Sequence, residues 1–554
     1  AIIIGHIIEE KAINLAISSE SQKQVWSFNR QILEYSDITN DPDSFLVART
    51  IHKLEPILEE QCLKAMELDE IKVFPKNLKL NTYAIGRVPT LTTLKRGEYK
   101  NCEVIDGGRR ILSASMTRQK IKPFVDVVTG VIEKIELESI NKDIYTYSGT
   151  KVFGATNRSM KITQNTARST GFPVSAAGKG RTAYQSQVSC IAEALERYSA
   201  NYPILKVPEI KLKYSDNPEI VIHPNEIMQY SEYQFANRHR INSESKGLIH
   251  KVPKQFNEND EIYWTPVINL ICKEKSKLIP TSMLGFNYTK NLQEGTAICC
   301  SNGLSSGNSV SEAMVQAIYE VIERDSCAIW WYNKIKVSEA RIPDDLKYYA
   351  NDITNGLKEL GRNINLLNLP TDFPIHVIAC VSHKEDGQQI CVGLGSHSDY
   401  SIAVSRAITE MYQMMVGETT KLQKRVNRDG NGGIDFIVQK WLLEENIVDH
   451  CHLIPSNNIS SIDNLSQKEE YNFIHIEEEL EWLLEIFKKK EMDIYGANYT
   501  AKSVGFPVSK VFIPEMRHFW PRLAPGRLYD LPVKLGYLKE AKQESELNPI
   551  GFFF

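Results

Sequence analysis

Two stretches of the chain place carboxylates, an amide and an arginine at helical spacing. The first, residues 311–325, reads SEAMVQAIYEVIERD. At about 100° per residue, its polar side chains share one face of a helix between apolar arcs: Glu312, Gln316, Glu320, Glu323 and Arg324. Like charges this close destabilise a helix unless something cationic lies beside them. The spacing therefore predicts a helix that faces a bound cation.

The second stretch, residues 189–198, reads SCIAEALERY and repeats the spelling ExxER. Its polar side chains also fall within one third of a turn: Ser189, Glu193, Glu196 and Arg197. Carboxylates on two such helices suit Mg²⁺, which binds a few carboxylates together with phosphate oxygens. The arginine that ends each motif can hold a phosphate. The repetition favours a nucleotide–Mg²⁺ site over the alternative, solvated surface helices with weak ion pairs.

A glycine-rich segment precedes each acidic helix. SAAGKGRT spans residues 175–182, and SNGLSSGNS spans residues 301–309. Glycine lets a backbone approach phosphate closely, and the N-terminus of a following helix favours anions. Neither segment is a Walker A loop, because Lys179 is followed by Gly180 where that motif needs Ser or Thr. We expect both segments to be loops that support the nucleotide site.

The composition is that of an ordinary globular protein of two to four domains, with 554 residues, 42% hydrophobic and 24% charged. A net charge of −4 without a basic block argues against a nucleic-acid partner. No apolar run approaches the roughly 18 residues of a membrane span. Ten cysteines without a CxxC pair are typical of reduced thiols in a cytoplasmic protein. Because Ala1 opens inside an apolar run, we expect the chain to begin partway through a domain.

The apolar pattern predicts an α+β fold with antiparallel sheets, because strands and helices mix without regular βαβ alternation. Helices are expected over 44–72, 181–200, 309–334 and 401–417. Strands are expected over 123–137, 143–155 and 261–273, over 373–382 and 388–397 around the charged turn HKEDG, and as a pair within 504–516. Residues 216–260 and 420–470 are polar and are expected to be loop-like.

Three other groups of residues carry a functional and a structural interpretation. The sequence DHCH at 449–452 could bind a metal, and Cys299 with Cys300 could be redox-active. The aromatic run AIWWYN at 328–333 could stack on a base or contact a peptide. In each case we favour packing in the core as the better interpretation.

Taken together, the motifs resemble a known family. SxxxExxER from Ser189 to Arg197, ExxxQ from Glu312 to Gln316 and ExxER from Glu320 to Arg324 resemble, in order, the three signature motifs of the YcaO superfamily. SNGLSSGNS, SRAITEMYQ and RHFWPRLAPGRLYDLPVKLGYL (517–538) resemble its azoline-forming cyclodehydratases, such as the cyanobactin heterocyclases. The resemblance covers roughly residues 120–538.

The resemblance implies a YcaO fold, in which mixed and antiparallel sheets and packed helices surround a central ATP site with several Mg²⁺ ions and no zinc. By motif position it implies these metal ligands: Glu193, Glu196, Glu312, Glu320 and Glu323. It implies these ATP-binding residues: Lys179, Ser189, Arg197, Asn308, Gln316, Arg324 and Arg406.

The resemblance also divides the chain into two domains. Residues 1–115 are similar to the C-terminal portion of an E1/ThiF-like α/β module and a linker, and residues 116–554 would form the YcaO domain. The first portion has no GxGxxG motif and no paired CxxC zinc ligands, so we expect it to dock a partner and not to adenylate.

The implied reaction is an ATP-dependent cyclodehydration of Cys, and by extension Ser or Thr, in a ribosomal precursor peptide. Phosphorylation of the attacked amide oxygen makes it a leaving group, and a thiazoline or oxazoline ring remains. The implied partners are the peptide and an upstream or separate leader-recognition protein, and the implied assembly is a cytoplasmic homodimer. Family members commonly end in a Pro-rich tail, whereas ELNPIGFFF contains only Pro549, so the catalytic base stays unassigned. Two alternatives remain open: a YcaO enzyme that forms a thioamide or amidine, and a non-catalytic peptide-binding scaffold.

Overall fold

The computed structural model describes residues 108–126, 130–138, 150–157, 175–202, 204–205, 207–244, 250–288, 297, 299–426, 436–456, 471 and 473–552. The predicted helix at 44–72 and residues 1–107 of the expected E1/ThiF-like module lie outside these ranges.

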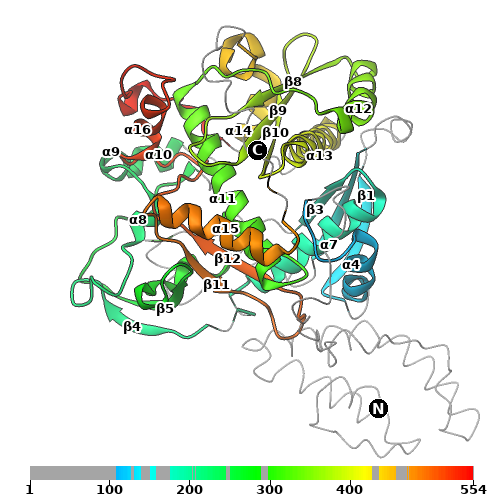
Figure 1. The fold of residues 1–554 in the computed structure, drawn as a ribbon. Helices are drawn as coiled ribbons and strands as arrows, with labels where there is room; N and C mark the ends of the chain where they lie inside the picture. Colours follow the sequence, from blue (N-terminus) through cyan, green and yellow to red (C-terminus); the bar gives the residue numbers. More distant parts are fainter. Residues whose placement is uncertain are drawn as a thin grey trace, which may run out of the picture.

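Helix α11 (Val310–Asn333) runs through the middle of the molecule and is buried along almost its whole length (Figure 1). The Ser309 side chain caps its start by accepting a hydrogen bond from the backbone N–H of Glu312, 3.1 Å away. The helix ends at Lys334, whose backbone is left-handed with φ of 50°. Apolar side chains from most of its circumference pack into one extensive core, so its polar stripe is held in the interior.

Two three-stranded antiparallel sheets share one plan, in which the last strand leads into a helix that packs back on it. The first contains β1 (Ile132–Glu138), β2 (Lys151–Asn157) and β3 (Ser175–Gly180), followed by α7 (Ala183–Ser199). The second contains β8 (Arg362–Asn368), β9 (His376–Lys384) and β10 (Cys391–His397), followed by α13 (Tyr400–Val426). The topological counterpart of α7 is therefore α13, although the matching ExxER motifs lie on α7 and α11.

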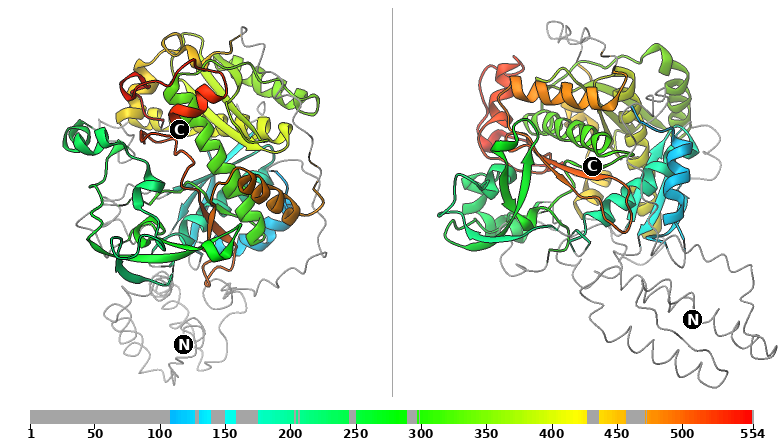
Figure 2. Two further views of the ribbon diagram at one scale, coloured as in Figure 1. Left: turned by 60° about the vertical axis from the view of Figure 1, so that its left-hand side comes forward. Right: turned by 60° about the horizontal axis from the view of Figure 1, so that its bottom comes forward.

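A six-stranded antiparallel sheet forms the remaining layer, in the order β4-β5-β11-β12-β7 with β6 beside β5. Its strands are β4 (Ile210–Lys213), β5 (Glu261–Asn269), β6 (Lys277–Pro280), β7 (Leu304–Ser306), β11 (Tyr495–Asn498) and β12 (Val508–Phe512). Strand β7 joins this sheet directly to the start of α11, and both views of Figure 2 show the sheet beside that helix.

The remaining helices cover the outside of these layers: α4 (Ala114–Ile121), α8 (Pro224–Met228), α9 (Glu232–Ala236), α10 (Arg238–Glu244), α12 (Lys347–Glu359), α14 (Phe436–Glu444), α15 (Ile476–Lys489) and α16 (Arg527–Lys534). Buried ion pairs fix α16 beside α11. Arg527 Nη2 lies 2.7 Å from Asp325 Oδ2 on α11 and 2.7 Å from Asp372 Oδ1. The tie holds the C-terminal part of the chain on the central helix.

The expectation that residues 175–182 form a phosphate loop is wrong. Residues 175–180 are strand β3, because each of them pairs with a residue of β2. A Cβ placed on Gly178 would lie 2.0 Å from the backbone nitrogen of Cys190, so this glycine lets α7 cross the strand at close range. At the second segment, Gly303 has φ of 72°, and the three residues that follow it form β7. Gly178 therefore serves packing and Gly303 a turn, whereas Gly307 lines the cavity described below.

Most of the other predicted elements are found with shifted ends. The helices at 181–200 and 309–334 and the strands around HKEDG are confirmed as α7, α11 and the β9–β10 pair. The pair within 504–516 is wrong, because β12 is its one described strand and pairs with β11 and β7. The loop predictions for 216–260 and 420–470 are also wrong, since α8, α9 and α10 lie in the first range, and the end of α13 and all of α14 lie in the second. Short capped helices of this kind carry too few periodic positions to stand out.

The structure shows packing contacts for the DHCH sequence at 449–452, for Cys299 and for the aromatic run at 328–333. The rings of His450 and His452 lie against Trp441 and Trp331, 4.9 and 5.4 Å between centroids. In the described ranges no three His, Cys, Asp or Glu side chains are placed to hold a metal. Trp331 is fully buried, and Cys299 packs against the core beside β5, β11 and β12.

Among the helices that the structure describes, none is long and apolar enough to cross a membrane.

We predict that Gly393→Ala separates α13 from β10. A Cβ at Gly393 would lie 1.9 Å from the backbone nitrogen of Met411, and neither backbone can move without disturbing the core. The free energy of unfolding, measured by urea denaturation, should fall by about 2–3 kcal/mol or more. Gly417→Ala is the control, because a Cβ there meets nothing within 4 Å. Equal stability of the two variants would contradict the packing role.

Candidate functional site

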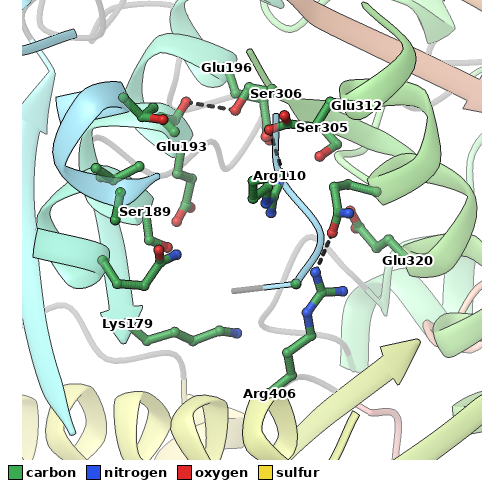
Figure 3. A pocket seen from close by; sticks show the side chains of 18 of the residues that line it. Arg110, Lys179, Ser189, Glu193, Glu196, Ser305, Ser306, Glu312, Glu320 and Arg406 are labelled. Atoms are coloured by element: carbon green, nitrogen blue, oxygen red, sulfur yellow. Dashed lines mark hydrogen bonds and ion pairs between the residues drawn. The ribbon is translucent and has the colours of Figure 1, made fainter. Parts of the chain in front are cut away.

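One cavity of about 670 Å³ lies between α7, α11, α13 and the segment that leads into α4. All twelve residues singled out from the sequence line it: Lys179, Ser189, Glu193, Glu196, Arg197, Asn308, Glu312, Gln316, Glu320, Glu323, Arg324 and Arg406. Figure 3 shows these walls facing one another, with Glu193 opposite Glu320 and Arg406 reaching in from α13. The structure thus brings the predicted set together, whereas the role of each member stays a prediction.

The α7 wall carries Ser189, Glu193, Glu196 and Arg197 on one face. Arg197 Nη2 lies 3.4 Å from Glu193 Oε1, one helical turn away. Glu196 is buried, and burial raises its pKa well above the ordinary value although Arg197 acts in the opposite direction. This wall therefore presents more negative charge than its arginine balances.

The α11 wall shows the same excess of negative charge. Arg324 Nε lies 3.8 Å from Glu320 Oε1, and burial raises the pKa of Glu320 despite that neighbour. Burial, together with the negative charge of Glu410 on α13, raises the pKa of Glu323 to about 7. These carboxylates are thus held where a cation would relieve both their desolvation and their repulsion.

Three polar side chains reach into the cavity, and two of them, Gln316 and Arg324, have hydrogen-bonding capacity left over. Arg406 donates from Nη2 to the side-chain oxygen of Gln316 and from Nη1 to the carbonyl of Ser396, 3.0 Å away. The amide nitrogen of Gln316 and Nη1 of Arg324 have no hydrogen-bond acceptor within the described part of the chain. Buried donors of this kind need an acceptor, so they fit an anionic ligand such as a phosphate chain.

Glu312 differs from the other predicted metal ligands because the chain already satisfies its oxygens. Arg110 Nη1 lies 3.2 Å from Oε1, and the backbone N–H of Ile111 donates to Oε2 at 3.0 Å. The backbone N–H of Asn308 also donates to Oε1 at 3.2 Å. Glu312 thus ties the segment before α4 to the start of α11, and Figure 3 shows Arg110 in the cavity beside it.

Lys179 projects from β3 and forms an ion pair with Glu410 of α13. Burial alone would raise the pKa of Glu410, but Lys179 and Arg324 outweigh it and lower the pKa. Glu410 was missed in the sequence, although it stands one turn after Arg406 in the segment SRAITEMYQ that was singled out. Arg110 and Thr117 also line the cavity, and their sequence surroundings carried no signal.

The acidic residues fit Mg²⁺ held jointly with a nucleotide better than they fit a closed protein cage. Within the described ranges, no three His, Cys, Asp or Glu side chains converge closely enough to hold an ion alone. The carboxylates of the cavity are spread over three helices instead. Mg²⁺ commonly takes one or two carboxylates and completes its shell with phosphate oxygens and water, which matches this spacing.

As far as Phe552, where the described residues end, the C-terminal segment does not reach the cavity. The backbone N–H of Asn548 donates to the carbonyl of Tyr332 at the end of α11, 2.7 Å away. The buried Phe552 ring packs against Trp331 and Phe519, 5.0 and 5.2 Å between centroids. Pro549 is exposed, and no described residue after Phe506 lines the cavity. The structure therefore places no catalytic base from this segment at the site.

Comparison with known proteins links the cavity to one family. A family model described as "YcaO cyclodehydratase, ATP- and Mg²⁺-binding" matches residues 177–517, more than half of the chain. A solved heterocyclase in complex with substrate and cofactor superposes with a TM-score of 0.70 at 29% identity, over 80% of this chain and 58% of that one. The heterocyclase TruD superposes with a TM-score of 0.60 at 22% identity, which shows the fold alone, over 84% of this chain and 57% of that one.

A curated relative in Escherichia coli (strain K12) is the ribosomal protein S12 methylthiotransferase accessory factor YcaO. It is 23% identical over 391 residues, which are 62% of this chain and 57% of that protein. This chain thus spans less than two thirds of the length of these three similar proteins. The expected α+β fold with antiparallel sheets is confirmed by the solved relatives.

We predict that Glu323 makes the stability of the ligand-free protein depend on pH. A carboxyl with a pKa of about 7 when folded and 4.5 when unfolded binds more protons in the folded state between these values. The folded state therefore loses stability as pH rises through that window, by roughly 3 kcal/mol in full. Glu323→Gln should remove this loss, so that the variant gains stability over the parent between pH 5 and pH 8.

The measurement is urea unfolding at both pH values with EDTA and without nucleotide. Glu481→Gln, an exposed substitution on α15, is the matched control and should leave the pH dependence unchanged. A stability difference between Glu323→Gln and the parent that is the same at pH 5 and pH 8 would contradict the raised pKa.

Proposed function

The chain belongs to the YcaO family, and from that premise we propose that it uses ATP and Mg²⁺ to cyclodehydrate Cys residues in a ribosomal precursor peptide, with Ser and Thr as further candidates. One observation carries the proposal: the twelve residues picked out by motif, from four separate parts of the chain, line one cavity. The heterocyclase with substrate and cofactor, at 29% identity, supports the reaction class.

We assign the nucleotide's phosphates to the cationic and amide side of the cavity. Lys179, Arg324 and Arg406 supply positive charge, and the unpaired amide of Gln316 supplies a donor. Mg²⁺, when bound, would neutralise the charge that develops on the phosphates. Glu193, Glu196, Glu320 and Glu323 would hold it, and Glu410 joins them as a candidate that the geometry adds. Glu312 keeps its predicted place in the site, but as an anchor for Arg110 and Ile111 it is the weakest candidate for a ligand.

The chemistry follows from the need to remove an amide oxygen. A substrate thiol attacks the preceding backbone carbonyl, and the oxyanion that forms takes the γ-phosphoryl group of ATP. Loss of inorganic phosphate then leaves a thiazoline ring, and the amide oxygen departs with that phosphate. Phosphoryl transfer depends mainly on positioning and charge neutralisation, which the arginines and the lysine of the cavity provide. The enzyme needs no nucleophile of its own for these steps.

We further propose that residues 116–554 form the catalytic domain and that residues 1–115 dock a partner that recognises the leader of the precursor peptide. The homodimer expected from the resemblance remains part of this proposal.

Mass spectrometry of a Cys-containing precursor peptide incubated with the full chain, its leader-recognition partner, ATP and Mg²⁺ tests the proposal. We expect the loss of one water per ring and one equivalent of phosphate released with it. Exchange of oxygen for sulfur, with sulfide present, would instead identify a thioamide-forming enzyme. Peptide binding without ATP consumption would identify a scaffold.

We predict that Glu320→Gln and Glu410→Gln each reduce the rate of phosphate release at least about 100-fold, because each removes a negative charge from the proposed metal side of the cavity. Glu481→Gln on the exposed face of α15 is the control for charge removal and should retain the parental rate. Circular dichroism verifies the fold of each variant. Parental phosphate release by folded Glu320→Gln would refute the site assignment.

A further inference from the structure

A second, small cavity lies behind the α11 wall of the nucleotide site. Its volume is about 30 Å³, and Val321 of α11, the residue after Glu320, lines it. Three cationic or potentially cationic side chains line it: Lys510 from β12, and His518 and Arg522 from the segment 517–538. That segment was singled out in the sequence, and the proposed reaction assigns it no task.

Several polar atoms of the residues that line this cavity are buried without a partner: three are donors, and one, Asn302 Oδ1, is an acceptor. Arg522 and Lys510 are 2% exposed and His518 is 5% exposed. Within the described residues, Nε and Nη2 of Arg522 and Nε2 of His518 have no hydrogen-bond partner. Lys510 donates to the carbonyl of Cys300 at the cavity wall. Buried polar atoms without partners are uncommon in folded proteins, so this group indicates a bound molecule or ion that accepts from Arg522 and His518.

The charge around the cavity is also unbalanced. None of its described lining residues is acidic. The guanidinium of Arg522 lies over the rings of Tyr230 and Trp520, 5.4 and 5.7 Å from their centroids, and aromatic faces only partly offset a buried positive charge. The charges felt by His518 are those of Arg522, Arg324 and Lys510, and burial together with these cations lowers the pKa of this imidazole well below its ordinary value. Lys510 interacts electrostatically with Glu196 and Glu320, but these two acids line the other cavity.

We propose that this cavity binds one small inorganic anion of the size of chloride. An anion accepts from the unpaired Nε and Nη2 of Arg522 and supplies the negative charge that the lining lacks. A water could accept there and donate to Asn302 Oδ1, but it would leave the positive charge unbalanced. The volume of the cavity limits the class of ligand. One water needs a cavity of roughly 10–15 Å³. A cavity of about 30 Å³ therefore admits a single small ion or water and leaves no room for a nucleotide or a peptide. The anion would interact with Lys510 and Arg522 and so stabilise their positions beside α11, the helix that carries Glu320.

Thermal unfolding of the full chain without nucleotide tests the proposal. Sodium chloride or bromide is titrated against sodium methanesulfonate, an anion too large for the cavity, at constant ionic strength. We expect a saturable rise in melting temperature of at least about 2 °C with either halide. Arg522→Gln should abolish this rise, and Arg240→Gln, which changes an exposed arginine on α10, should retain it.

If Arg522→Gln fails to fold, Lys510→Met and crystals of the parent protein grown in bromide provide the second measurement. Anomalous scattering from bromide beside Arg522 and His518 is the expected result. Identical melting temperatures in halide and methanesulfonate, or a crystal that has only water in the cavity, would overturn the proposal.

Discussion

The burial of carboxylates from α7 and α11 against a shared cavity is the constraint on which the structure depends. Folding removes Glu196, Glu320 and Glu323 from water. The pKa values of these three carboxyl groups are raised, so the arginines beside them do not fully offset the loss of hydration. Such an arrangement persists only where the rest of the molecule holds it in place. The core around α11, the tie from Arg527 to Asp325 and the caps at Ser309 and Lys334 supply that support.

The supporting layers depend on close contact between backbones. In both three-stranded units a helix returns across the last strand at a glycine, Gly178 beneath α7 and Gly393 beneath α13. A side chain at either position would push the helix away from its sheet, and with it the wall of the cavity that the helix carries. Gly178 and Gly393 thus help to set the width of the cavity, although they do not line it.

The features that sequence alone revealed are those encoded locally. The helical period of α7 and α11 is strong because each has one polar stripe between apolar arcs, and the repeated ExxER made their faces recognisable as parts of one site. The strand at 175–180 was not predicted from the sequence, because it depends on pairing with β2, which lies elsewhere in the chain. The bond from Ile111 to Glu312 spans 201 residues, and the contact of Lys179 with Glu410 spans 231, so neither leaves a local pattern. Distance along the chain, more than chemistry, limited what could be inferred.

The ion pair between Lys179 and Glu410 joins the two topologically equivalent units across the cavity. Each partner is engaged by the other as long as the cavity holds no competing charge. A polyanion that drew Lys179 toward itself would remove one of the two cations beside Glu410, whose carboxylate would then attract another cation more strongly. The reverse exchange holds equally, because linkage between two binding events is reciprocal. An anion and a cation would therefore favour each other's binding through an exchange of salt-bridge partners at Lys179 and Glu410.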